Sequence, residues 1–346
     1  MREAGIATRG SECLPVRRLS RRRAIRIVAA AAGLPLMIAA IRATAPPAPR
    51  FRWEGRVLDD EAELTLWHTN AALCRRIILK IQAEIARYER IFSLYDPESE
   101  ISRLNAAGVL QRPAPELRVL IEESQRFGVM SAAAFDISVQ PLWRLYEAHF
   151  WSRAHIVEDI IARAQEVARE LVDFRRIDAN AASIAFEREG MCITLNSIAQ
   201  GFITDAIADL LRNEGFETAV VDLGEFRTLG HHPDGRPWRI DVRNPPAANG
   251  ADRVIELENM ALAVSGGYGT TFEPTGRFHH IFDPQSGTSA NRLADAAVIA
   301  PRATTATALA VAACVLGEER AHALLKKCPG ARAVVTRPDG TFASIG

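Results

Sequence analysis

The sequence predicts a single α+β domain with mixed or antiparallel sheets and packed helices, after an N-terminal export signal. Apolar stretches with strand and helix periods interleave along the 346-residue chain without the strict alternation of βαβ units. The sequence contains no internal repeat, heptad array or long low-complexity segment. Lysine plus arginine and aspartate plus glutamate number 42 each, so the overall charge favours neither nucleic acid nor an anionic membrane as a partner.

The N-terminal 45 residues have the composition of an export signal. Six arginines within 17–26 precede an apolar run at 27–40, and residues 43–45 form a small-x-small tripeptide. The apolar run is too short to span a membrane comfortably. Residues 20–26 resemble the twin-arginine signal, which carries folded proteins to the periplasm, although Ala24 stands where phenylalanine is usual.

Cleavage of this signal is one of two interpretations. An uncleaved anchor in the inner membrane is the other, because Pro46 directly follows the expected cut and a proline there hinders cleavage. Residues 46–51 are interpreted as a proline-rich linker, and residues 52–346 as the folded domain.

The cysteines favour buried thiols over a zinc site or a disulfide scaffold. Cys13 lies in the signal, and the sequence has no C-x-x-C spacing. Cys74, Cys192 and Cys314 lie in apolar surroundings, where a thiol behaves as a small apolar side chain. A single bridge among these three and Cys328 stays open in an oxidising compartment.

The first half of the domain alternates strands with helices. Residues 52–69 predict one or two strands, and residues 71–92 predict an amphipathic helix, because apolar residues recur about every four positions. A short helix opens at Ser99, which leaves Tyr95 beside a helix start. Tyr95 either fills a gap in the core or stacks on a planar ligand. Residues 116–127 predict a further helix.

Residues 131–188 place one carboxylate among apolar neighbours. Asp136 follows Phe135, and a carboxylate there must be paired or must meet a ligand rich in donors. A proline-started segment follows at Pro141. Residues 148–170 are polar and helical, and residues 174–188 predict a strand hairpin.

The chain is organised around residues 193–211, ITLNSIAQGFITDAIADLL. The pattern predicts a strand that ends in a tight turn near Ser197 and feeds the N-terminus of a helix. Unpaired N–H groups and the helix dipole make such a turn suitable for a phosphate or diphosphate. The alternative is an ordinary β-turn-α connection in which Gly201 only allows close packing.

The second half predicts mainly short strands. Strand-like patterns cover residues 219–230, 240–243 and 262–265, with a turn at 233–235 and a glycine-rich Gly266-Gly267-Tyr268-Gly269 stretch. Two adjacent histidines, His279 and His280, are expected in a strand, where at most one enters a given site. The chain then predicts, in order, a strand at 295–300, a helix at 304–316, and a helix and strand within 322–335.

Six motifs in this order resemble the ApbE-type FAD:protein FMN transferases from about residue 52 to the end. They are FSLYDPESEISRLN, AFDISVQPLWRLY, ITLNSIAQGFITD, VVDLGEFRTLG with PDGRPWRIDVRNP, LAVSGGYG and HHIFDPQSG. The resemblance implies an ApbE-like α+β fold. It also implies FAD bound as substrate, Mg²⁺ at its diphosphate, and transfer of FMN to a threonine or serine hydroxyl of another protein with release of AMP.

The resemblance also implies roles for individual residues. His280 would take the proton from the target hydroxyl. Glu225 and Arg227 would shape the site or a groove for the partner. The residues that would contact FAD are Tyr95, Ala134, Phe135, Asp136, Thr194, Gln200 and Ile281; Thr194 stands where the family commonly has aspartate.

The implied metal site departs from the family pattern. Ser197 would offer its backbone carbonyl to the metal. Thr307 and Val311 stand where the family usually has aspartate and threonine, and Val311 has no donor atom. Magnesium favours carboxylate and phosphate oxygens, so it would depend on the diphosphate, water, Ser197 and the hydroxyls of Thr304 or Thr307.

Three functions follow from this pattern. The first is a periplasmic FMN transferase that serves a membrane-bound electron-transfer flavoprotein. The motif forms and the signal look most like the members that accompany nitrous oxide reduction (NosX-like), which implies a role in denitrification. The second is a non-catalytic FAD-binding protein that has lost its metal site, and the third is an FAD pyrophosphatase that uses water as the nucleophile.

Overall fold

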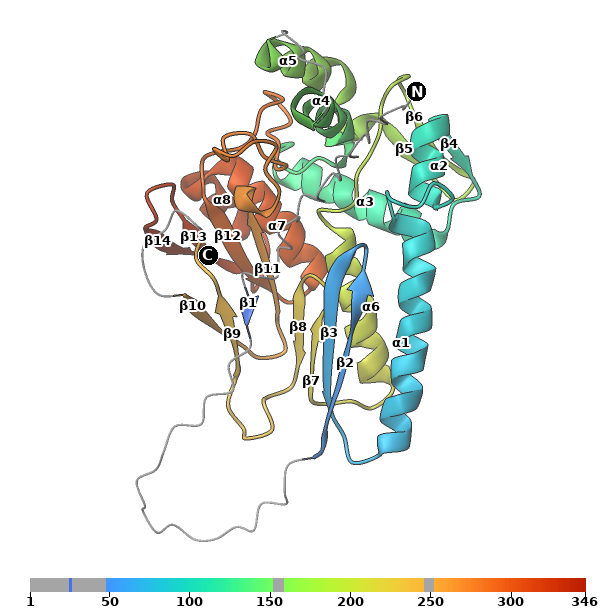
Figure 1. Cartoon of the computed structure of the whole chain (residues 1–346), viewed down its shortest axis with the longest axis vertical. Helices are drawn as coiled ribbons and strands as arrows, with labels where there is room; N and C mark the ends of the chain where they lie inside the picture. Colours follow the sequence, from blue (N-terminus) through green and yellow to red (C-terminus); the bar gives the residue numbers. More distant parts are fainter. Residues whose placement is uncertain (1–24, 27–47, 152–158, 246–251) are drawn as a thin grey trace, which may run out of the picture.

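The computed structural model describes residues 25–26, 48–151, 159–245 and 252–346 (Figure 1). The predicted signal therefore lies outside the described residues except for β1 (Ile25–Arg26), which pairs antiparallel with β9 (Trp238–Val242). β2 begins at Arg50, two residues before the expected start of the domain. No helix in the described part of the chain is long and apolar enough to cross a membrane.

An eight-stranded sheet forms the centre of the molecule, and every pair of neighbours in it is antiparallel. This confirms the predicted fold class, with helices packed on the sheet (Figure 1). In spatial order the strands are β14 (Phe342–Ile345), β13 (Arg332–Thr336), β12 (Asp295–Ala300), β11 (Ala261–Gly266), β8 (Phe226–Leu229), β7 (Ala219–Asp222), β3 (Asp60–Trp67) and β2 (Arg50–Val57).

Two small antiparallel sheets flank the large one. β10 (Arg253–Leu257) pairs with β9, which pairs with β1. The other sheet has the order β4 (Val109–Gln111), β6 (Ser183–Phe186), β5 (Ile177–Ala179), and its β5–β6 pair is the predicted hairpin within 174–188.

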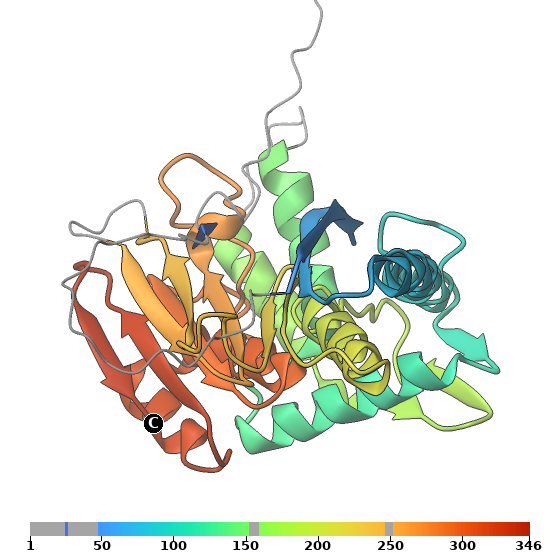
Figure 2. The same cartoon turned by 90° about the horizontal axis from the view of Figure 1, so that it is seen from below.

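Helices α6 and α7 pack on one face of the large sheet (Figure 2). α7 contacts β11 and β12, and α6 contacts β7, β8 and α7. A continuous core of buried aliphatic and aromatic side chains fills the space between them. The helices are α1 (Ala71–Phe92), α2 (Glu100–Ala107), α3 (Pro115–Met130), α4 (Gln140–Trp151), α5 (Ile160–Leu171), α6 (Ala199–Asn213), α7 (Ala303–Leu316) and α8 (Glu318–Leu325).

The predicted helix boundaries are good where capping residues and periodicity agree. α1 spans the predicted range, and the Asn70 side chain caps it by accepting from the Leu73 N–H at 3.0 Å. α2 begins after Ser99, whose hydroxyl accepts from the Ser102 N–H at 3.2 Å, as expected. In the predicted helix at 148–170, α4 ends at Trp151, residues 152–158 lie outside the described residues, and α5 begins at Ile160.

Two predicted strands are absent from the described structure. Residues 193–195 form no strand, because the Asn105 side chain bonds both the N–H and the carbonyl of Ile193, at 2.7 and 2.8 Å. The Thr194 N–H donates to the Ile137 carbonyl instead of to a strand. His279 and His280 lie in a loop where the pairing is limited to isolated bridges, one at His279 and one at Phe282.

The stretch 219–230 is a hairpin of β7 and β8, not one strand. Gly224 turns the chain there with φ of +109°, a conformation that favours glycine. Cys74, Cys192 and Cys314 are buried, as predicted, and they and Cys328 are free thiols.

Candidate functional site

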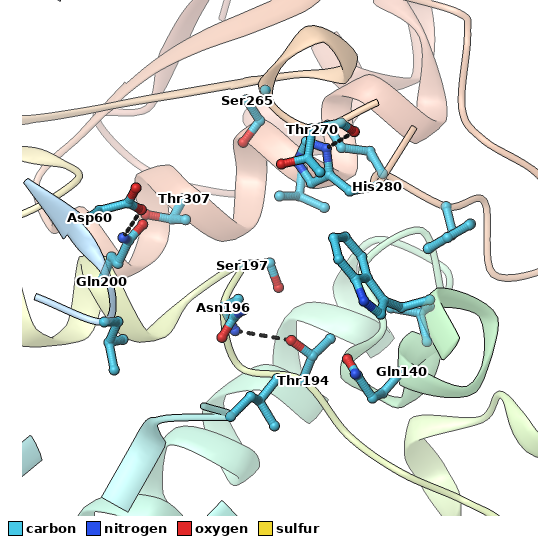
Figure 3. Close-up of a pocket in the computed structure, with 18 of the residues that line it drawn as sticks. Asp60, Gln140, Thr194, Asn196, Ser197, Gln200, Ser265, Thr270, His280 and Thr307 are labelled. Carbon is cyan, nitrogen blue, oxygen red and sulfur yellow. Dashed lines mark hydrogen bonds between the residues drawn. The ribbon is translucent and has the colours of Figure 1, made fainter. Parts of the chain in front are cut away.

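A cavity of about 580 Å³ lies among the loops at one end of the large sheet. Figure 3 shows residues that line it. Its walls come from the β2–β3 turn, the loop before α2, the start of α4, the loop into α6, the loops after β11, and α7. A cavity of this size is typical of sites that bind a nucleotide or cofactor.

The cavity brings together nine of the eleven predicted site residues. Two predicted residues do not line it: Phe135, which is 1% exposed and contacts Phe127 in the core, and Thr304. The nine that line it are Tyr95, Ala134, Asp136, Thr194, Ser197, Gln200, His280, Ile281 and Thr307.

The N-terminus of α6 faces the cavity. Ser197 and Gln200 line the cavity on either side of the helix start, and no side chain caps this end of α6. The turn is further fixed by the Asn196 N–H, which donates to the Thr194 hydroxyl at 3.3 Å (Figure 3). A helix end with uncapped N–H groups and a positive dipole can hold an anionic diphosphate.

The N-terminus of α7 is occupied by protein instead. Asp205, fully buried on α6, accepts from the N–H groups of Ala303 and Thr304, both at 2.9 Å, and from the Thr304 hydroxyl at 2.8 Å. The same carboxylate pairs with Arg227. The hydroxyl of Thr304 is therefore committed to Asp205, and the structure places it outside the cavity, away from the metal position suggested by the sequence.

Glu225 and Arg227 do not line the cavity either. Both are buried, at 4% and 5% exposed, and the Arg227 guanidinium points to Asp205 between α6 and α7. Their place is behind the wall of the cavity, where Arg227 supports the position of α7.

Asp136 is a buried carboxylate at the wall, 8% exposed. It accepts from the N–H and hydroxyl of Ser138, at 2.7 and 2.6 Å, and from the Phe174 N–H at 3.1 Å. Burial raises the pKa of Asp136 to about 6, and the three hydrogen bonds act in the opposite direction. The expectation that an apolar neighbourhood forces this carboxylate to find partners agrees with these contacts.

His280 lies at the cavity, whereas His279 does not line it. The His280 Nδ1 lies 3.1 Å from the Thr270 carbonyl, and since a carbonyl only accepts, Nδ1 carries the hydrogen (Figure 3). The neutral ring then has its lone pair on Nε2, the form of a general base. His279 is 3% exposed, and its Nε2 lies 3.3 Å from Asn291 Oδ1.

Tyr95 is 59% exposed and lines the cavity at the start of α2. Of the two interpretations of this ring, the structure excludes the gap in the core. An exposed aromatic ring at a cavity mouth is available to stack on a planar ligand.

Thr307 alone does not suit a hard divalent cation, but the oxygen atoms of Thr307, Ser197 and Asp60 together do. The Thr307 hydroxyl donates to the Ala303 carbonyl at 2.8 Å, so its oxygen retains lone pairs toward the cavity, and Val311 contributes carbon only. The wall also contains Ser197 and the carboxylate of Asp60. This set of oxygens suits magnesium better than zinc, although the described residues contain no group of three His, Cys, Asp or Glu side chains spaced to hold a metal.

The sequence interpretation missed the β2–β3 turn and Trp143, which also line the cavity. The pair Asp59-Asp60 between two predicted strands was the available signal for the turn, because Asp is common in hairpin turns. Leu58 and Asp59 both have positive φ there, 49° and 72°. For Trp143 the available signal was its place in the proline-started segment, two residues after Pro141.

Comparisons with known proteins all identify similarity to one family. The model of the ApbE family matches residues 58–335. An FAD:protein FMN transferase of Vibrio cholerae is 31% identical over 241 residues, which are 67% of this chain and 71% of the relative. One of Treponema pallidum is 32% identical and covers 74% of this chain and 75% of its own length.

Solved structures agree with the fold. The apo form of the Pseudomonas stutzeri flavinyl transferase ApbE superposes with a TM-score of 0.74 at 26% identity, covering 87% of this chain and 96% of that chain. The ApbE protein of Thermotoga maritima has the same TM-score at 23% identity and covers 86% and 97%. The residues matched by the family model include Tyr95, Ser197 and His280.

Proposed function

Because the chain belongs to the ApbE family, we propose that it transfers FMN from FAD to a threonine or serine hydroxyl of a target flavoprotein, with release of AMP. The observation that carries this proposal is the arrangement of one cavity. It combines an aromatic ring at its mouth, Tyr95, an uncapped helix N-terminus beside Ser197, and a histidine with a defined tautomer, His280.

The cavity supplies what the reaction needs. The target hydroxyl oxygen attacks the phosphorus of the FMN half of FAD, and the bond from that phosphorus to the oxygen of AMP breaks. The product is a phosphoester on the partner, and AMP leaves with the bridging oxygen. His280 Nε2 takes the proton of the attacking hydroxyl, because a hydroxyl is a weak nucleophile until it loses that proton.

Two parts of the chain position the reacting groups: the Thr270 carbonyl, which orients His280, and the N-terminus of α6. The Thr270 carbonyl fixes the ring of His280 through Nδ1, and the backbone N–H of His280 donates to the same carbonyl at 3.1 Å. The N-terminus of α6 holds the diphosphate in place by its N–H groups and dipole. In-line placement of the two reactants accounts for a large part of the rate enhancement in such transfers.

Magnesium is the proposed cofactor, and when bound it supplies charge neutralisation at the diphosphate. The residues that would hold it are Ser197, through its carbonyl, and Thr307, through its hydroxyl, together with the carboxylate of Asp60. All three residues line the same cavity.

We extend the proposal to the location and partner of the protein. The arginine-rich segment at 17–26 and the apolar run at 27–40 support export to the periplasm by the twin-arginine route, with a cleaved signal or a membrane anchor. The motif forms support a membrane-bound electron-transfer flavoprotein of nitrous oxide reduction as the target.

The test is transfer of FMN to a threonine-containing flavoprotein target, with FAD and Mg²⁺. Covalent flavin on the target, seen by its fluorescence in a denaturing gel, together with AMP in equal amount, is the expected result. The variant His280→Gln should lose transfer and still bind FAD. Free FMN with no labelled target would instead identify an FAD pyrophosphatase.

A second candidate function rests on one observation. Val311 gives the α7 wall no donor atom at a position where the family pattern has threonine, which favours a flavin-binding protein without catalysis. Calorimetric titration with FAD, with and without Mg²⁺, separates the two candidates. Affinity that does not depend on Mg²⁺ would support the non-catalytic flavin binder.

A further inference from the structure

We propose that Asp60, the first residue of β3, is the carboxylate that binds a divalent cation in the cavity and makes FAD binding depend on that cation. The inference rests on the proposed flavin transfer and names a ligand for it. It places the metal carboxylate at the start of β3, directly after the β2–β3 turn, and not on α7.

The charges of the cavity favour a bound cation. Among the described residues that line it, five carboxylates face one guanidinium: Asp59, Asp60, Glu61, Asp136 and Glu147 against Arg56. An anionic diphosphate that enters the cavity is repelled by these carboxylates, because like charges at short distance are unfavourable. The N-terminus of α6 offsets only part of that repulsion, since it acts as roughly half a positive charge. A bound divalent cation offsets the rest.

Asp60 is the carboxylate placed to hold that cation. It is half-buried at the cavity wall, and its Oδ2 accepts from the Gln200 Nε2 at 2.5 Å (Figure 3). In the part of the chain that the structure describes, this carboxylate has no Lys, Arg or His partner within salt-bridge distance, and no hydrogen bond is made to its Oδ1. A charge that is partly removed from water and lacks a cationic partner costs free energy unless a cation binds it.

Three other acidic residues that line the cavity have different surroundings. Asp59 is exposed and pairs with Arg56 at 2.6 Å, so its charge is already compensated. Glu61 is exposed on β3. Asp136 is surrounded by three protein donors, as described above. Asp60 therefore differs from each of them in combining partial burial, an open oxygen and a place on the wall.

The wall around Asp60 is built to hold it beside other oxygen donors. Gln200 is 4% exposed, and Gly224 makes room for its amide, because a Cβ at Gly224 would lie 2.7 to 2.9 Å from the amide atoms. Gly201, which follows Gln200, lets α7 pack closely: a Cβ at this position would lie only 2.6 Å from the Thr307 hydroxyl oxygen. Asp60, Gln200 and Thr307 thus belong to one connected wall, and Figure 3 draws them at the same end of the cavity, with Ser197 between them and His280.

The test compares two variants of adjacent residues in the full chain. Asp60→Asn removes the proposed ligand, and Asp59→Asn removes an equal charge from the β2–β3 turn beside it. Two measurements are made on each: Mn²⁺ binding by the loss of the free-ion electron paramagnetic resonance signal, with ADP present as the diphosphate, and FAD affinity with Mg²⁺ or with a chelator. We expect Asp60→Asn to weaken Mn²⁺ binding about tenfold or more and to abolish the Mg²⁺ effect on FAD. Asp59→Asn should stay within about threefold of the wild type, since its pairing with Arg56 is exposed.

A third variant distinguishes loss of a metal ligand from a local structural change caused by the substitution at Asp60. Thr307→Asp, added to Asp60→Asn, returns a carboxylate to the same wall from α7 and should restore Mn²⁺ binding. Equal Mn²⁺ affinity in Asp60→Asn and Asp59→Asn would overturn the assignment while leaving FAD transfer intact. Wild-type affinity for FAD that is unaffected by Mg²⁺ would also overturn it, and absence of FAD binding to the wild type would overturn the proposed function as well.

Discussion

The substitution Asp205→Asn tests whether one buried carboxylate holds α7 against the cavity. Asp205 is 0% exposed, and it accepts from two N–H groups and one hydroxyl at the start of α7. It also pairs with Arg227, whose Nε has no hydrogen-bond partner. Asparagine keeps the shape but removes the charge, so the Arg227 guanidinium is left buried without its counter-ion.

The expected loss follows from this geometry. Removing one partner of a buried ion pair costs about 3–5 kcal/mol, because the remaining charge stays buried and uncompensated. Asparagine can still accept one of the α7 hydrogen bonds, so we expect a loss near the lower end, about 3 kcal/mol in the free energy of unfolding. FAD affinity should fall as well, since α7 carries Thr307 and Val311 at the cavity wall.

The assay is equilibrium urea unfolding followed by tryptophan fluorescence and circular dichroism. The matched control is Asp209→Asn, one turn further along α6, whose carboxylate is 36% exposed and pairs with Arg302 at 2.6 Å. The half-exposed Arg302 also contacts Asp205, at 3.2 Å, so the two variants share this exposed partner and differ in the buried pair with Arg227. Exposed pairs contribute about 0–1 kcal/mol, so this control should be nearly neutral. A difference of less than about 1 kcal/mol between the two variants would refute the reasoning about the buried pair.

Three further predictions concern the cavity. Tyr95→Ala should weaken FAD binding by about 1–3 kcal/mol through lost stacking and leave the unfolding midpoint unchanged, because the ring is 59% exposed; flavin fluorescence titration measures the first and thermal unfolding the second. Burial raises the pKa of Asp136 to about 6 from 3.8, so the native state binds more protons than the unfolded state between these values. Stability should therefore fall by about 2 kcal/mol as the pH rises from 4 to 7, and urea unfolding of Asp136→Asn should lack this component. Gly224→Ala should destabilise the fold by at least about 1 kcal/mol and weaken FAD binding, because φ there is +109° and the new Cβ would displace Gln200; unchanged affinity would contradict the role given to that glutamine.

The sequence predicted the long elements well because local signals and packing agree there. The helix at 71–92 has both an asparagine cap and an apolar stripe that becomes buried at Cys74, Ile77 and Ile81. The extended stretch at 193–195 was predicted as a strand, since its apolar run has the composition of one. Its backbone is bonded by the Asn105 side chain from α2, a long-range contact that no local pattern contains.

In the candidate site, too, the contacts that could not be predicted are those between residues far apart in the sequence. Motif order located nine residues that the fold brings to one cavity, whereas Thr304 is turned toward Asp205 and Phe135 toward the core. Asp60 was missed because it is 140 residues from Gln200 in the chain, and only the folded sheet brings the start of β3 to the start of α6. Charge compensation across elements of this kind follows from tertiary structure and not from local sequence.

The measurement that tests the central claim most directly is the mass of a threonine-containing target flavoprotein after incubation with this chain, FAD and Mg²⁺. The account predicts a gain of one FMN less one water on a single hydroxyl residue, one AMP released per label, and no gain with His280→Gln. A target of unchanged mass, while the chain binds FAD and Mg²⁺, would contradict the assignment of this cavity to flavin transfer.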